Sequence, residues 1–256
     1  MSNEKVRILI GCPTFGIDPN PQRWLASLIT VTQDLRRAGH DMSFCFPYRK
    51  TVREGDNRIV KTALLNKCTH ILRMDDDIWG VQSGDIIKLL EADKEFISAV
   101  MYIGGFPYSR CAFLKKDKNL TLQQTELLGG SQLREVDGEG VQPCDLTAFP
   151  FTLWKVSLFE KFCYPYFDPK EINSEDTVFC QKCLDKGIQP HVHMDIQVNH
   201  REVTPWNRIF LYNSEARKML MTRRLDPTAP MYKILAEQFG EDGMKDLYQL
   251  KGVDLG

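Results

Sequence analysis

Strand and helix alternate through the first hundred residues, and this alternation limits the possible fold more than any other feature of the sequence. Runs of apolar and β-branched residues predict four strands, over 6–10, 41–47, 69–74 and 96–102. Residues with the apolar spacing of helices fill each interval between them. Such alternation predicts an α/β fold, with a mostly parallel central sheet flanked by helices and joined by right-handed crossovers.

The three intervening helices each show a recognisable start. The first is expected over 21–38, with Pro21 in its first turn and Gly39 at its end. The second should begin at Asp56 or Asn57, either of which can serve as N-cap. The third is expected over 83–92, capped by Ser83.

The second half of the chain is less regular. Glycine and polar residues dominate 104–145, with short strands expected at 111–114 and 132–136. Further strands are expected at 151–154 and 190–198, with a short helix at 159–162 and a longer one over 175–186 that Asn173 or Ser174 caps. From residue 213 the chain becomes charged and helical in pattern, which predicts a helical C-terminal extension over 213–256.

Composition excludes several classes of protein. With 33 basic and 34 acidic residues, the formal net charge is −1, which argues against a general nucleic-acid coat or a polybasic membrane protein. The hydrophobic share of 43% is too high for a disordered chain. We find no signal-peptide pattern and no apolar run of 18 residues, and the eight cysteines stand mostly as single residues. These features predict reduced thiols and a cytoplasmic protein.

Three adjacent carboxylates, Asp75, Asp76 and Asp77, form the sharpest local feature. They follow the strand expected at 69–74, so they lie at the carboxyl end of a parallel strand, where open α/β sheets bind ligands. Crowded carboxylates repel each other unless a cation joins them, and hard ions such as Mg²⁺ and Mn²⁺ prefer oxygen ligands. A solvated turn that caps the next helix explains the triplet equally well, and both interpretations stay open.

A second acidic pair, Glu175 and Asp176, opens the helix expected over 175–186. Acidic residues are favourable in a first helical turn, so the pair needs no function, although a carboxylate at a helix start can also serve as a general base. His200 ends the last strand, and a lone histidine is more often structural than a ligand. A zinc site built from Cys180, Cys183 and the nearby histidines is disfavoured, because that helix presents the cysteines to the core.

Four segments, taken in order, resemble a known family. They are 8–14, which holds the first strand and a Pro-Thr turn; 57–64, a helix led by Asn and Arg; 69–77, a strand with a DxD motif; and 149–200, which contains the acidic pair and ends at a histidine. Over roughly 5–203 the chain resembles the GT-A-fold nucleotide-sugar glycosyltransferases of the family-2-like inverting type found in bacteria and phages.

This resemblance implies a GT-A catalytic domain over 1–212, with a nucleotide-binding half at about 1–103 and an acceptor-binding half at about 104–212. Its donor would be a nucleotide-diphosphate sugar, for example of UDP, held with Mn²⁺ or Mg²⁺. The resemblance implies metal ligands at Asp75, Asp77 and His200, and nucleotide contacts at Pro13, Thr14, Arg58, Asp75 and Asp76. It implies that Asp176 is the general base and that Glu175 helps to bind the acceptor. Which Asp of the triplet has which role stays open.

The acceptor and two competing functions also stay open. A saccharide, a lipid carrier or modified DNA would each offer a hydroxyl, and basic residues after 213 either contact such an acceptor or form a solvated helix face. A nucleotidyltransferase is disfavoured because the turn 11–16 contains no Lys or Arg. A non-catalytic nucleotide-sugar-binding module on the same fold would not need the triplet, the acidic pair and His200 together.

Overall fold

The computed structural model describes residues 5–14, 21–48, 50–103, 109–128, 132–171 and 173–199. Almost all of them belong to one compact unit formed by 1–101 and 110–201, which contains the sheets and helices of the fold almost entirely. His200 and the helical extension expected over 213–256 lie outside the described residues. The boundary at 212 between the expected catalytic domain and this extension therefore stays a prediction.

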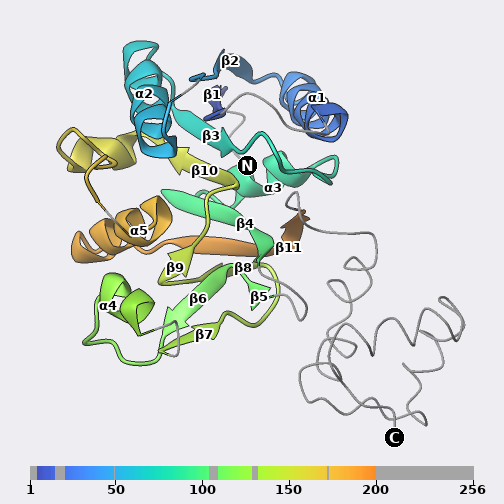
Figure 1. The fold of residues 1–256 in the computed structure, drawn as a ribbon. Coiled ribbons are helices and arrows are strands. Elements are labelled where there is room, and N and C mark those ends of the chain that lie inside the picture. Colours follow the sequence, from blue (N-terminus) through green and yellow to red (C-terminus); the bar gives the residue numbers. More distant parts are fainter. Residues whose placement is uncertain are drawn as a thin grey trace, which may run out of the picture. The chain divides into compact units, whose positions relative to one another are not determined.

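The central sheet confirms the expected fold class (Figure 1). Seven of its eight strands lie in the order β2-β1-β3-β10-β4-β11-β8, and the eighth, the two-residue β5 (Ser109–Arg110), pairs with β4 off this path. Their bounds are β1 Arg7–Gly11, β2 Asp41–Cys45, β3 His70–Met74, β4 Phe96–Ile103, β8 Val141–Pro143, β10 Phe151–Lys155 and β11 His191–Val198. Strands β1, β2, β3, β4 and β11 run in one direction, whereas β10 and β8 run antiparallel to their neighbours.

Helices cover both faces of this sheet. Helices α1 (Pro21–Arg37) and α3 (Asp85–Glu91) contribute to one hydrophobic cluster, and α2 (Val52–Leu65), the 3-10 helix η1 (Val156–Lys161) and α5 (Glu175–Asp185) contribute to the other. The alternation of strand side chains separates the two clusters, because Ile8 and Ile10 belong to the first and Leu9 to the second. The short helix expected at 159–162 corresponds to the second half of η1, which begins at Val156.

The face that carries α2 and α5 has an aromatic core. Its rings pack edge-to-face or tilted, with Phe167 and Phe179 centred 4.8 Å apart and Phe159 stacked on Phe179 at 5.5 Å. The other members are Phe96, Phe149 and Trp154. Fully burying one such side chain contributes about 1.5–3 kcal/mol. This packing fixes the middle of α5 against the sheet, so that the helix start is held at a defined place.

Two of the expected helix caps are wrong. Helix α2 begins earlier than expected, because Thr51 and Glu54 form a reciprocal capping box ahead of Asp56 and Asn57, which lie buried inside the helix. The cap of α3 is Gly84, in a left-handed conformation. Ser83 instead donates its hydroxyl to Asp34, 2.9 Å away. The expected cap of α5 is confirmed at Ser174, whose hydroxyl accepts from the Thr177 N–H.

A smaller three-stranded sheet, in the order β7-β6-β9, follows the central strands β4 and β5 in the chain. Its strands are β7 Leu133–Glu135, β6 Ala112–Lys115 and β9 Leu146–Thr147, and α4 (Leu122–Leu127) lies between β6 and β7 in sequence. The two short strands expected in this region are therefore confirmed: β6 is shifted by one residue, and β7 is one residue shorter at each end than expected.

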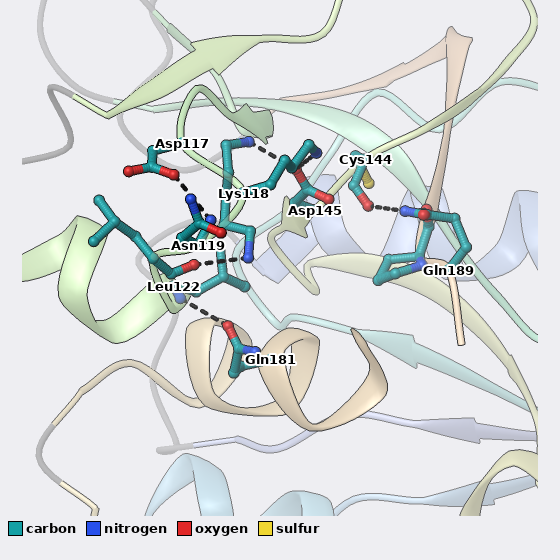
Figure 2. A network of polar contacts seen from close by, with 11 residues as sticks. Asp117, Lys118, Asn119, Leu122, Cys144, Asp145, Gln181 and Gln189 are labelled. Atoms are coloured by element: carbon teal, nitrogen blue, oxygen red, sulfur yellow. Dashed lines mark hydrogen bonds and ion pairs between the residues drawn. The ribbon is translucent and has the colours of Figure 1, made fainter. Parts of the chain in front are cut away.

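A polar network ties this region to α5 (Figure 2). The Gln181 side chain on α5 accepts from the Leu122 N–H at 2.7 Å, and it donates to Asp185 at 2.7 Å. The buried carboxylate of Asp145 accepts from Lys118 at 2.6 Å and from the Lys115 N–H at 2.7 Å. The Gln181 bonds, together with the aromatic core, hold α5, whereas the Asp145 bonds lie within the region of the smaller sheet.

All eight cysteines lie in the described part of the chain, and all eight are free. Six are buried, Cys45 is half-buried and Cys163 is exposed, which agrees with the expectation of mostly buried thiols. Among the described residues, no helix is both long enough and apolar enough to cross a membrane.

Candidate active site

The acidic triplet lies where expected, in the turn directly after β3. The backbone N–H of Asp75 donates to the Pro150 carbonyl at 2.9 Å, which holds the start of this turn against the chain that enters β10. All three aspartates are half-buried. Burial raises the pKa of the Cys12 thiol, and the carboxylates of Asp76 and Asp75 raise it further. The triplet therefore lies beside the turn that follows β1.

Arg73 is the cation of the site. It occupies β3 two residues before the triplet, and its side chain is only 3% exposed. Its Nη1 lies 2.6 Å from Oδ1 of Asp75, and its Nε lies 3.3 Å from Oδ1 of Asp56. Burial opposes the charge, but the carboxylates of Asp56, Asp75 and Glu175 outweigh burial and raise the pKa of Arg73. The guanidinium is therefore charged at every physiological pH.

Asp56 reaches Arg73 from α2 and is completely buried. Its Oδ2 has no hydrogen-bond partner within the described ranges. Burial raises the pKa of Asp56 to about 7; the nearby Asp75 and Glu175 add to that rise, and Arg73 opposes it. At least three carboxylates, those of Asp56, Asp75 and Glu175, therefore act on this one guanidinium.

The acidic pair at the start of α5 lies within electrostatic range of the same guanidinium. Asp176 lies in the first turn of that helix and accepts from the Thr177 N–H at 2.9 Å. Burial raises the pKa of Asp176 and Glu175 raises it too, while Ser174 and Arg73 lower it. Because Arg73 pairs with Asp75 and its charge also lowers the pKa of Asp176, the fold brings two acidic groups about a hundred residues apart in sequence within electrostatic range of one guanidinium.

Helix α2 holds the segment that leads into α5. The amide of Asn57 is 4% exposed and uses both of its ends: Oδ1 accepts from the N–H groups of Tyr166 and Phe167, and Nδ2 donates to the Phe167 carbonyl. Arg53, one turn earlier, donates to the carbonyls of Glu171 and Asn173. The family resemblance would place the start of this helix beside a nucleotide, but the Asn57 amide is occupied by protein.

Trp79, just after the triplet, pairs with the end of β11. Its N–H donates to the Asn199 carbonyl at 2.9 Å, and the Asn199 N–H returns a bond to the Trp79 carbonyl at 2.8 Å. The guanidinium carbon of Arg23 lies 4.7 Å from the centre of the Trp79 ring. Asn199 immediately precedes His200, so the described chain ends beside the turn that carries the triplet.

The residues expected to meet the nucleotide are placed differently from one another. Pro13 is buried and Thr14 half-buried, in the turn after β1, where the Thr14 N–H donates to the Pro47 carbonyl at 3.1 Å. Arg58 is exposed on α2. In the described part of the chain, no interaction joins the Arg58 side chain to the acidic groups.

Two central residues, Asp56 and Arg73, are missing from the set of site residues expected from sequence. A readable signal existed for Arg73, since a charged residue inside the apolar run Ile71–Met74 must find a buried partner. The sequence pattern points to Asp56 only as a helix cap. Once α2 is known to begin at Val52, its position inside the helix and on the sheet-facing side explains its burial.

The donor chemistry of the triplet fits a hard divalent cation, because it supplies carboxylate oxygens at the carboxyl edge of the sheet. Arg73 already holds one oxygen of Asp75, so it competes with a cation for that side chain. Among the described residues, no three His, Cys, Asp or Glu side chains are grouped closely enough to hold a metal, and His200 lies outside that set. Cys180 and Cys183 lie in the hydrophobic cluster between α5 and the sheet, as the core-facing side of the helix expected from sequence indicates.

No family model matches the chain, and no curated protein matches its sequence. Among solved structures, the chain is similar to A197 from STIV, with 14% identity and a TM-score of 0.47 over 76% of this chain and 85% of that one. It is also similar to the catalytic domain of Drosophila β1,4-galactosyltransferase 7, solved in complex with xylobiose, with 12% identity and a TM-score of 0.44 over 88% of this chain and 82% of that one. These values describe a loose similarity of the backbone path.

Proposed function

We propose that the protein is a metal-dependent glycosyltransferase that moves a sugar from a nucleotide-diphosphate sugar to a hydroxyl acceptor, with inversion at the anomeric carbon. One observation carries the proposal: Asp75 of the triplet pairs with Arg73 at 2.6 Å, and the acidic pair that opens α5 lies within electrostatic range of the same guanidinium, whose charge lowers the pKa of Asp176. Two separate carboxylate groups at one edge of an α/β sheet match the two needs of the reaction, which are a cation site for the donor and a base for the acceptor.

On the donor side, Asp77 and Asp75 would hold Mn²⁺ or Mg²⁺, with His200 completing the set, and Asp76 beside them. When bound, the cation would neutralise the charge that develops on the diphosphate leaving group. Pro13 and Thr14, in the neighbouring turn after β1, would meet the nucleotide base. Because Arg73 holds Oδ1 of Asp75, the turn is already anchored before any donor arrives.

On the acceptor side, Asp176 would take the proton of the acceptor hydroxyl. The acceptor oxygen then forms its bond to the anomeric carbon as the bond from that carbon to the nucleotide diphosphate breaks. Burial raises the pKa of Asp176, and a carboxylate with a raised pKa is a stronger base. Glu175, its neighbour in the first turn of α5, would help to orient the acceptor.

The first test is a thermal-shift screen of UDP-, GDP-, CMP- and dTDP-sugars, each with and without Mn²⁺. A ligand that binds only the folded protein raises the melting temperature by mass action, so we expect a rise for one base, and only with the metal. Pyrophosphate release from a nucleoside triphosphate would indicate a nucleotidyltransferase instead. Donor binding without transfer to any acceptor in a broad panel would indicate a binding module.

Two substitutions separate the donor and acceptor roles. Asp77→Ala should abolish metal-dependent nucleotide binding, while Asp137→Ala, at a carboxylate whose side chain is 95% exposed, should leave it unchanged. Asp176→Asn should keep donor affinity and lower kcat by about 10²–10⁴-fold, the range expected for loss of a general base. Normal Mn²⁺–nucleotide affinity in Asp77→Ala, or full activity in Asp176→Asn, would remove that residue from its role.

A further inference from the structure

Three side chains on one face of α2 bond to residues that support the two acidic groups. Arg53, Asp56 and Asn57 are separated by three and four positions, which places them on the same side of the helix. Asp56 bonds toward the triplet, whereas Arg53 and Asn57 bond toward the segment that enters α5. Helix α2 therefore contacts both Arg73, which pairs with the triplet, and the segment that leads into the acidic pair.

The contact toward the triplet runs through Arg73. Asp56 accepts from Nε and Asp75 accepts from Nη1 of the same guanidinium, so a planar, rigid group connects α2 to the first residue of the triplet. Both Asp56 and Arg73 are excluded from solvent. A lysine at this position would present a single point charge and could not reproduce the two-sided contact.

The contact toward the acidic pair runs through main-chain groups. Asn57 makes three hydrogen bonds with Tyr166 and Phe167, at 2.9, 3.2 and 2.5 Å. Arg53 holds the carbonyls of Glu171 and Asn173. The chain then passes directly through the Ser174 cap into Glu175 and Asp176.

The helix is itself firmly seated. Its start is closed by the Thr51–Glu54 capping box. Its Gly55 lies so close to the turn after β1 that an added Cβ would come within 2.9 Å of the Pro13 Cβ, and a side chain at Gly11 would overlap Ile59. Side chains on a seated helix can fix a site more precisely than side chains on a loop.

We propose that α2 is a positioning element that sets the distance between the two acidic groups: Asp56, through Arg73, holds the triplet, and Asn57 holds the segment that carries Glu175 and Asp176. This inference rests on the proposed function for the roles of the two groups. None of the three α2 side chains needs to touch a substrate. Outer-shell partners of this kind typically change metal affinity or activity by about 10–100-fold when they are replaced.

A kinetic separation tests the proposal. Asp56→Asn and Arg73→Lys should weaken Mn²⁺-dependent nucleotide binding by about tenfold, because the triplet loses its anchor. Asn57→Ala should lower kcat by about tenfold and leave nucleotide affinity within about twofold, because only the acceptor side moves. The matched control is Asp145→Asn, at another buried aspartate, whose bonds go to Lys115 and Lys118; it should change stability alone. Equal effects of Asp56→Asn and Asn57→Ala on both parameters would overturn the proposal.

A second readout needs no donor. With ¹⁵N-labelled arginine, the Arg73 Nε–H should exchange slowly with solvent, and Asp56→Asn should shift and accelerate it. Asn57→Ala should shift the backbone amides of Glu175 and Asp176, which Asp145→Asn should leave in place. If the wild type binds no nucleotide with Mn²⁺, the proposed function fails while this readout still decides the positioning role. Fast exchange of Arg73, or unmoved amides in Asn57→Ala, would refute the positioning role whatever the donor experiments give.

Discussion

Two buried aspartates of this protein, Asp56 and Asp145, meet a basic side chain in different surroundings. Asp145 accepts from the Lys115 N–H and from Lys118. The Lys118 side chain is 65% exposed, so its ammonium group stays in contact with solvent. Asp56 meets Arg73, which is as buried as itself, and one of its oxygens has no hydrogen-bond partner within the described ranges.

The difference lies in the cost of burying charge. The Asp145 contact joins parts of the small-sheet region and costs less in desolvation than the Asp56 contact, since only its carboxylate is buried and its cation stays hydrated. The Asp56 contact removes two charges from water and lies next to further carboxylates, an arrangement that hydrophobic residues of similar volume would often match or exceed in stability. Clusters with shifted pKa values gather at functional sites, and the position of this one beside the triplet agrees with that tendency.

The largest expected effect comes from removing the buried cation. Arg73→Met leaves Asp56 and Asp75 without their partner, and it should lower the free energy of unfolding by about 3–5 kcal/mol. Urea denaturation at neutral pH measures this change. Adding Asp56→Leu to the same protein should restore part of the loss, because the uncompensated carboxylate is then gone. A loss below about 1 kcal/mol for Arg73→Met would erase the distinction between the two contacts.

The pH dependence of stability should also reveal the unusual surroundings of Asp56. The pKa of Asp56 is raised from 3.8 to about 7, so the folded protein keeps this proton over a range in which the unfolded chain has released it. Folding is therefore favoured at low pH, and stability falls as pH rises from about 4 to about 7, on the order of 3 kcal/mol for this group. Urea denaturation at pH 5 and pH 8 should show this fall in the metal-free wild type and a smaller one in Asp56→Asn.

A moderate effect is expected at Asp145. Asp145→Asn loses the charge-assisted bond to Lys118 but keeps an acceptor for the Lys115 N–H, so the free energy of unfolding should fall by about 1–2 kcal/mol. Denaturation curves give the stability, and a metal titration of the same sample should match the wild type. Altered Mn²⁺ affinity would show that the small-sheet region also influences the site.

The smallest effect is expected for the exposed partner. Lys118→Ala should lower the free energy of unfolding by less than about 1 kcal/mol, because solvent screens the pair and the Lys115 N–H still satisfies Asp145. Thermal denaturation at two salt concentrations checks the value and its screening. A larger loss at low salt would mean that this surface pair contributes more than its exposure suggests.

Local patterns in the sequence predicted most elements of the fold. The strands at β1, β3 and β11 and the cap at Ser174 are confirmed within a residue or two, because apolar spacing and capping depend on neighbours in sequence. The insertion of β10 between β3 and β4, antiparallel to both, was not predicted. A strand's local pattern gives its buried faces but does not say which strands lie on its two sides.

The misplaced caps have specific causes. Ser83 has the residue type of a cap, but its hydroxyl is taken by Asp34, which is far away in sequence. The true start of α2 was readable, since Thr51 and Glu54 have the spacing of a capping box. Because Asp56 and Asn57 were interpreted as the N-cap of α2, their place on the buried face of the helix, where they bond to Arg73 and to the segment before α5, was missed.

The candidate site was predictable in part. The triplet and the acidic pair lie in the turn and at the helix start expected for them, and the family resemblance proposed their roles. Their convergence on Arg73 depends on how α2, β3 and α5 pack, and a single sequence contains no direct signal of that packing. The roles of Asp77, Asp176 and His200 stay predictions that the substitutions above can test.

The close approach at Gly55 couples the position of α2 to the turn after β1. A methyl group there would have to push α2 away from Pro13, since the two would otherwise be 2.9 Å apart. Both acidic groups are supported from that helix, so a displacement of a few tenths of an ångström would reach them together. If the proposed function holds, side-chain size at this position, which touches no substrate itself, would change the spacing of the site while every carboxylate is retained.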